Sequence, residues 1–176
     1  MDYKRIIEDI VIISKKAGNK ILEIYNSPDI DINIEVKKDL SPLTIADKAS
    51  NEIIINELNS LSPRLPILSE EEKNVEYKNR KDWSEFWLVD PLDGTKEFIN
   101  RNGDFTVNIG LIESGTPTMG VIVTPINNCI WTGSLTDGAC KLLNGTQQII
   151  ETRQANKTKM TVVASRSHRS PELESF

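Results

Sequence analysis

Two groups of acidic residues each follow a short apolar run, and carboxylates placed in this way can bind hard cations. Three consecutive glutamates, residues 70–72, come directly after Pro-Ile-Leu-Ser. Asp90 and Asp93 come directly after Trp-Leu-Val. Mg²⁺ prefers oxygen ligands, and two such ions about 3.5–4 Å apart can clamp a phosphoryl group while one of them polarises a water. The two groups together suggest hydrolysis of a phosphate monoester, a reaction that is extremely slow without help.

Each position of Asp-Pro-Leu-Asp-Gly-Thr, residues 90–95, could serve such a site. Pro91 restrains the turn, so that both carboxylates and the Leu92 carbonyl could face one point. Gly94 would let a phosphate approach the backbone, and the amides of Gly94 and Thr95 would open a short helix whose N-terminus favours an anion. The alternative is a solvated acidic face beside an ordinary turn. The residues alone leave both interpretations open.

The composition excludes several other kinds of protein. The chain has 176 residues and a net charge of −5, which argues against binding a nucleic acid polymer. With a single histidine, His168, it cannot assemble a Cys/His zinc site, and a Ser-His-Asp triad would depend on that one residue. Cys129 and Cys140 are expected to be two buried free thiols.

The expected compartment is the cytoplasm. The N-terminus carries acids early, unlike a secretory signal, and the sequence has no apolar run long enough to span a bilayer. No transmembrane segment is therefore expected, and peripheral association at the inner membrane is the alternative.

The predicted elements place both acidic groups at strand ends. Apolar residues at helical spacing predict a first helix over residues 6–25, and Thr44 is expected to cap a second helix that ends near Leu61. Short strands at residues 67–68 and 86–89 run directly into the two acidic groups. Helices followed by strands predict an α+β layered fold.

The other expected elements complete this layout. An antiparallel meander is predicted over residues 105–113, 118–124, 129–134 and 139–143. Further elements are a strand at 32–36, a loop or short helical excursion at 72–85, a helical turn at 96–99, a strand at 162–164 and a helix opening at 170–172.

The run Trp-Leu-Val-Asp-Pro-Leu-Asp-Gly-Thr, residues 87–95, resembles the metal-binding signature of the inositol monophosphatase superfamily. Three more segments resemble other elements of this family in the same order: Ser-Pro-Leu-Thr-Ile-Ala-Asp, Leu-Ser-Glu-Glu and Gly-Val-Ile-Val-Thr-Pro, at residues 41–47, 68–71 and 120–125. The continuation over residues 96–108 and the segment 163–168 resemble the CysQ-type 3′(2′),5′-bisphosphate nucleotidases more than the inositol phosphatases.

The resemblance implies a set of metal ligands. Glu70, Asp90 and the Leu92 carbonyl would bind a first Mg²⁺, and Asp90 would bridge to a second ion that Asp93 also binds. Glu71 would act through water on a weaker third ion. The resemblance thus implies two or three Mg²⁺ ions in each site.

The resemblance also implies the catalytic residues. Thr95, hydrogen-bonded to Asp47, would orient and deprotonate the attacking water, and Glu70 completes this set. The amides of Gly94 and Thr95 would hold the phosphate. Lys37 is either a surface lysine or a contributor near the site. The residues expected at the substrate are Glu70, Leu92, Asp93, Gly94 and Thr95.

The implied activity is removal of the 3′-phosphate of adenosine 3′,5′-bisphosphate, which gives AMP and phosphate and clears a by-product of sulfate activation. The implied mechanism is in-line attack by a metal-activated water, dependent on Mg²⁺ and inhibited by Li⁺. One alternative is an inositol or sugar phosphatase. Another is a catalytically impaired remnant that acts only by association or has no activity.

The implied fold is the N-terminal part of the layered αβαβα sandwich of the inositol monophosphatase and fructose-1,6-bisphosphatase type. Residues 1–158 would form an α+β metal-binding domain, and 159–176 would begin a truncated C-terminal α/β domain. The family's remaining metal ligand, the Asp of a later Trp-Asp element, has no counterpart, because Trp83, Trp87 and Trp131 precede other residues. A weakened second metal site and an uncovered apolar face open to self-association are therefore expected.

Overall fold

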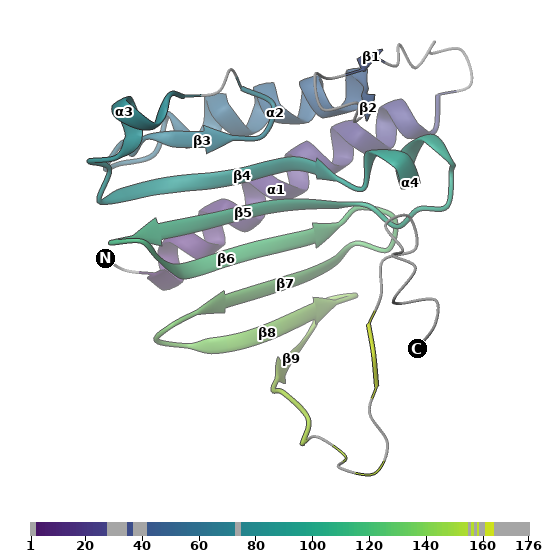
Figure 1. Ribbon diagram of the computed structural model, residues 1–176. Coiled ribbons are helices and arrows are strands. Elements are labelled where there is room, and N and C mark those ends of the chain that lie inside the picture. The colour runs from purple at the N-terminus through teal and green to yellow at the C-terminus, as the bar shows by residue number, and fades with distance from the viewer. Residues whose placement is uncertain are drawn as a thin grey trace.

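The computed structural model describes residues 3–27, 35–36, 42–72, 75–154, 156, 158 and 161–163. Two long helices cover one face of a seven-stranded sheet in this part of the chain (Figure 1). The helices are α1 Tyr3–Tyr25, α2 Ile45–Leu58, α3 Tyr77–Arg80 and α4 Thr95–Ile99. The helices predicted at residues 6–25 and 96–99 are confirmed, and so is the second long helix, although α2 ends before Leu61.

The main sheet contains its strands in chain order, from β3 to β9. The strands are β1 Glu35–Val36, β2 Pro42–Leu43, β3 Ile67–Ser69, β4 Glu85–Asp93, β5 Thr106–Glu113, β6 Thr116–Thr124, β7 Cys129–Ser134, β8 Gly138–Leu143 and β9 Thr146–Ile150. β3 and β4 are parallel, and every later pair is antiparallel, so the predicted meander is confirmed. β1 and β2 form a separate two-stranded sheet.

The last strand was not predicted from the sequence. β9 is the polar segment Thr-Gln-Gln-Ile-Ile, which lacks the apolar alternation of a half-buried strand. It pairs with β8 across Asn144 and Gly145, which both have positive φ, at 51° and 78°. Asn-Gly is the preferred dipeptide of such tight hairpins, so the turn signal was present although the strand signal was weak.

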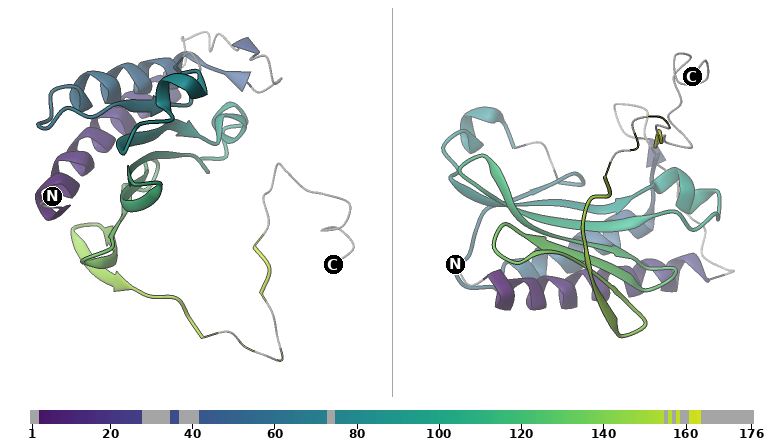
Figure 2. Two further views of the ribbon diagram at one scale, coloured as in Figure 1. Left: turned by 60° about the vertical axis from the view of Figure 1, so that its left-hand side comes forward. Right: turned by 90° about the horizontal axis from the view of Figure 1, so that it is seen from below.

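The core lies between the sheet and α1. The residues of α1 that face the sheet are buried at helical spacing: Ile10, Ile13, Ala17, Ile21 and Ile24. Gly18 allows a close approach, because a Cβ there would lie 3.2 Å from Cγ of Pro125. α1 packs against β5, β6 and α2, so both long helices form one layer on the same side of the sheet (Figure 2).

The opposite face of the sheet is uncovered within the described residues (Figure 2). A broad groove of about 1460 Å³ lies there, lined by residues from β3 to β7. Leu88, Ile122 and Leu135 expose apolar side chains, at 46%, 43% and 70%. The division of the chain into residues 1–158 and 159–176, and self-association through this face, stay predictions.

The remaining sequence predictions have mixed outcomes. Cys129 and Cys140 are free, as expected, but only Cys129 is buried, whereas Cys140 is half-buried. Residues 161–163 are described without a strand, and of the predicted strand at 32–36 only residues 35–36 are described. The helix opening at 170–172 lies outside the described residues. Among the residues that the structure describes, no helix has the length and hydrophobicity that crossing a bilayer requires.

Candidate active site

The parallel pairing of β3 and β4 brings the two acidic groups together. Ser69 lies opposite Val89 in the register, and the amide of Glu70 donates a hydrogen bond to the Val89 carbonyl over 3.0 Å. Glu70 therefore lies beside Asp90, just after the end of β3 and just before the irregular last residues of β4. The prediction that the acidic groups meet at the strand ends is confirmed for these two residues.

Asp90 is the residue of the site whose pKa is raised to about 7. Its Oδ1 atom is buried and has no hydrogen-bond partner within the described part of the chain. Burial, followed by the charges of Glu70 and Asp93, raises the pKa of Asp90 to about 7. A buried carboxylate oxygen without a donor, flanked by two further carboxylates, fits a cation as its missing partner.

The carboxylates do not form a compact ligand set as they stand. Among the described residues, no group of three or more Asp, Glu, His or Cys side chains is gathered closely enough to hold a metal ion. Asp93 is exposed, and its Oδ2 accepts a hydrogen bond from Asn108 Nδ2 over 3.4 Å. The charges of Glu70 and Asp93 still act on Asp90. Because like charges repel, a compact arrangement needs a cation between them, or a proton such as the one that Asp90 and Glu70 can share through their side-chain hydrogen bond.

The turn after Asp90 departs from regular strand geometry. The register of β4 with β5 shifts between Asp90 and Asp93. Gly94 has φ 97°, and a Cβ there would lie 2.7 Å from the carbonyl oxygen of Asp104. Only glycine fits such a position without strain, which agrees with the prediction that Gly94 keeps this backbone open. Thr95 then begins α4.

Thr95 and Asp47 form the predicted pair. The Thr95 hydroxyl donates to Oδ1 of Asp47 over 3.0 Å, and it also lies 3.4 Å from the Leu92 carbonyl. Asp47 is fully buried, and burial raises its pKa although its hydrogen bonds oppose the shift. Asp47 Oδ2 accepts from the backbone amide of Thr44 over 2.7 Å, within a capping box that starts α2. The hydrogen bond expected from the sequence is therefore confirmed.

Two polar residues of α2 also contact the site, and the sequence interpretation did not include them. The Ser50 hydroxyl donates to the Pro91 carbonyl over 2.7 Å. The Asn51 side chain accepts from Ser69 Oγ over 2.6 Å and donates to Glu72 over 2.8 Å. Their spacing from Asp47 was the available signal, because residues three and four positions apart share a helix face. Lys37 lies outside the described residues.

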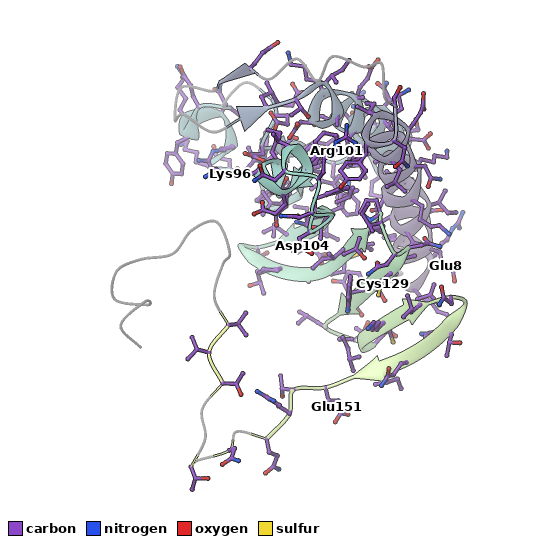
Figure 3. All side chains as sticks on the ribbon, turned by 90° about the vertical axis from the view of Figure 1, so that its right-hand side faces the viewer. Glu8, Lys96, Arg101, Asp104, Cys129 and Glu151 are labelled. Atoms are coloured by element: carbon purple, nitrogen blue, oxygen red, sulfur yellow. The ribbon has the colours of Figure 1, made fainter. Side chains whose placement is uncertain are left out.

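An aromatic cluster supports α4 from behind. The rings of Tyr25, Phe98 and Phe105 contact one another with centroids 5.2–5.5 Å apart. The Arg101 guanidinium lies 4.7 Å from the Tyr25 ring centroid and also donates a hydrogen bond to the Tyr25 carbonyl. Figure 3 shows Arg101 next to α4, with Lys96 and Asp104 at the same end of the sheet. These contacts fix α4, and with it Thr95, against the end of α1.

Comparisons with known proteins agree with this fold and site. The model of the inositol monophosphatase family matches residues 2–175. The chain therefore belongs to the inositol monophosphatase family.

Within the family, similar proteins include nucleotidases. The 3′(2′),5′-bisphosphate nucleotidase CysQ of Shigella flexneri is 40% identical over 97% of this chain and 67% of its own length. The CysQ nucleotidase of Buchnera aphidicola is 37% identical over 99% of this chain and 64% of its own length. The expected resemblance to CysQ-type nucleotidases is confirmed.

Solved structures show the same fold. The crystal structure of CysQ from Bacteroides thetaiotaomicron matches with a TM-score of 0.69 and 39% identity, over 93% of this chain and 63% of that one. A structure of SuhB from Bartonella henselae matches with a TM-score of 0.72 and 28% identity, over 86% of this chain and 56% of that one. The predicted fold class is confirmed, and the chain spans about two thirds of the length of its CysQ relatives.

Proposed function

We propose that this chain carries the metal-binding and water-activating residues of a Mg²⁺-dependent phosphomonoesterase that removes the 3′-phosphate of adenosine 3′,5′-bisphosphate. The observation that carries the proposal is the hydrogen bond from Thr95 to Asp47 over 3.0 Å, next to the strand end that holds Asp90. The choice of substrate rests on the similarity to nucleotidases named CysQ. The expected products are AMP and inorganic phosphate.

The donor set fits Mg²⁺. Glu70, Asp90, Asp93 and the Leu92 carbonyl offer only oxygen ligands, which this ion prefers. The buried, unpartnered oxygen of Asp90 supports this choice. Among the relatives, a phosphatase of this fold has been crystallised with Mg²⁺ and phosphate. In such sites Mg²⁺ polarises water and phosphate oxygens. How many ions bind, and whether Glu71 contributes through water, belong to the proposal.

Thr95 and Asp47 would move the proton. Because the Thr95 hydroxyl donates its hydrogen to Asp47, its oxygen keeps lone pairs that can accept a hydrogen bond from a water. The water would pass a proton to Thr95 while Thr95 passes its own to Asp47. Burial raises the pKa of Asp47, which makes its carboxylate a stronger base than an exposed aspartate.

Gly94 and Thr95 would hold the phosphate through their backbone amides. Gly94 has no side chain between the turn and a phosphate, and in its left-handed conformation it leads directly into Thr95. The amides of these two residues are the proposed phosphate donors. α4 has five residues, so this assignment rests on local amides rather than on a long helix dipole.

Phosphate release from adenosine 3′,5′-bisphosphate tests the proposal. The chain is assayed with Mg²⁺, with and without Li⁺, beside inositol 1-phosphate as the competing substrate. Thr95→Val should lower the rate by a factor of about 10²–10⁴, whereas Thr95→Ser keeps the hydroxyl and should retain most activity. Thr146→Val, on exposed β9, is the matched control.

Two results would refute the proposal. If the folded Thr95→Val variant releases phosphate at an unchanged rate, the proposed proton relay through Thr95 is refuted. If phosphate is released faster from inositol 1-phosphate than from the nucleotide, the chain is an inositol phosphatase rather than a nucleotidase. A structure of a relative soaked in LiCl is described as an inhibitory complex, so inhibition by Li⁺ is expected of any activity found here.

A further inference from the structure

Three buried polar side chains lie on one face of α2 and reach three different segments of the site. Asp47, Ser50 and Asn51 follow the spacing i, i+3, i+4, which places them on the same side of the helix. Their exposed fractions are 0%, 0% and 7%. Asp47 contacts α4, Ser50 contacts the bulged end of β4, and Asn51 contacts the end of β3. α2 lies along these strands (Figure 1).

Ser50 fixes the Pro91–Leu92 peptide unit, one residue after Asp90. The register of β4 with β5 shifts just after Asp90, so the regular ladder does not continue through Pro91. A buried carbonyl needs a hydrogen-bond partner, and the Ser50 hydroxyl provides one over 2.7 Å. Loss of that hydroxyl would free the backbone on which the Asp90 carboxylate is mounted.

Asn51 contacts side chains on both sides of Glu70. Its Oδ1 accepts from the hydroxyl of Ser69, the residue before Glu70, over 2.6 Å. Its Nδ2 donates to the carboxylate of Glu72, two residues after Glu70, over 2.8 Å. One amide therefore spans Glu70, and both of its polar ends are in use.

We propose that Ser50 and Asn51 are positioning residues for a divalent cation: from α2 they set Asp90 and Glu70 in place without contacting the ion. This inference rests on the proposed function, because it assumes that these carboxylates bind Mg²⁺. The competing explanation is that both residues only attach α2 to the sheet. The two explanations differ in one measurable respect. A purely structural role lowers stability but leaves the ion affinity of the folded protein unchanged.

Calorimetric titration of the folded chain with Mg²⁺ alone separates these explanations. Ser50→Ala and Asn51→Leu should each weaken Mg²⁺ binding about tenfold or more, as loss of groups that orient metal ligands commonly does. Two controls should keep the wild-type dissociation constant. Ser14→Ala removes an equally buried hydroxyl that has no partner among the described residues. Ile54→Val lowers stability from the same helix without a polar contact.

A second pair of variants covers the case in which a buried substitution prevents folding. Glu72 is exposed, so its variants should fold. Glu72→Gln and Glu72→Met both remove the charge and keep the length, but only glutamine retains an acceptor for Asn51. Glu72→Met should therefore bind Mg²⁺ more weakly than Glu72→Gln.

The outcomes distinguish the two proposals. The positioning role is supported if the wild type binds Mg²⁺, the variants Ser50→Ala, Asn51→Leu and Glu72→Met bind it more weakly, and the controls do not. If the wild type and all variants bind Mg²⁺ with equal affinity, the positioning role is overturned, whereas the metal site stands. A folded wild-type chain that takes up no Mg²⁺ refutes the metal site itself, and the positioning role with it.

Discussion

Replacing Asp90 by asparagine tests whether its carboxylate is a destabilising charge that a cation relieves. Burial and the charges of Glu70 and Asp93 raise the pKa of Asp90 from 3.8 to about 7. The folded chain therefore keeps a proton at pH values where the unfolded chain has lost it. The contribution of Asp90 to stability consequently falls as the pH rises from about 4 to about 7, and that contribution is constant above this range.

The size of the effect follows from these two pKa values. In full, the difference corresponds to about 4 kcal/mol, and partial contact of Asp90 with water reduces this to about 2 kcal/mol. Asp90→Asn removes the charge at nearly constant volume. Its free energy of unfolding in EDTA should exceed that of the wild type by about 2 kcal/mol at about pH 8, and the gain should shrink toward zero near about pH 4.

Urea unfolding in EDTA and in millimolar Mg²⁺ measures both parts of this prediction. Mg²⁺ should stabilise the wild type by about 1.4 kcal/mol when its concentration is about ten times the dissociation constant, and Asp90→Asn should lose that gain. Asp82→Asn is the matched control, since its side chain is 83% exposed, and it should change stability by less than about 0.5 kcal/mol. Lower stability of Asp90→Asn in EDTA at about pH 8 would refute the reasoning, and so would a retained response to Mg²⁺.

Three further substitutions test the scaffold, each by its urea midpoint. Gly94→Ala should cost at least about 2 kcal/mol, because Gly94 has a positive φ and a Cβ there would lie 2.7 Å from a backbone oxygen. Gly115→Ala is the control and should cost less, because Gly115 has a positive φ but a Cβ there would meet nothing within 4 Å. Equal costs would exclude the contact as the cause. Thr44→Val removes the capping hydroxyl of α2 and should cost about 1 kcal/mol, so a neutral result would contradict the capping box. Arg101→Met keeps the stem but removes both the charge above the Tyr25 ring and the hydrogen bond to the Tyr25 carbonyl, so it should cost at least about 1 kcal/mol. No loss would mean that the stem alone fixes α4.

The sequence predicted the strands that carry the site because their signals are local. A continuous apolar run leads into Asp90 and a shorter one leads into Ser69, so both strands could be located from composition, although β4 continues to Asp93. The turn of Gly94 was also readable, since Asp-Gly favours a positive φ. β9 was missed, because its polar residues hide the strand period even though an Asn-Gly turn precedes it.

The contacts between elements were harder to predict, because they depend on which faces meet. Nothing local to Ser50 indicates that it will contact the carbonyl of Pro91, 41 residues away. The Thr95–Asp47 hydrogen bond was expected only through the family resemblance, and the structure places the two groups 3.0 Å apart. The proposed metal ligands are a similar case, since the family resemblance implied which residues they would be but not the exposed position of Asp93.

The composition of α2 connects these observations. Its ends are anchored by ordinary apolar burial, through Ala46 near the start and Ile54 and Leu58 near the finish. Between these anchors the buried face is polar, and an apolar face there would bury more hydrocarbon and stabilise the fold more. The polar residues instead contact α4, β4 and β3, which are the three segments that carry Thr95, Asp90 and Glu70. The buried face of α2 is therefore polar only where it meets the three segments of the proposed site, and positioning that site explains this pattern better than support of the core does.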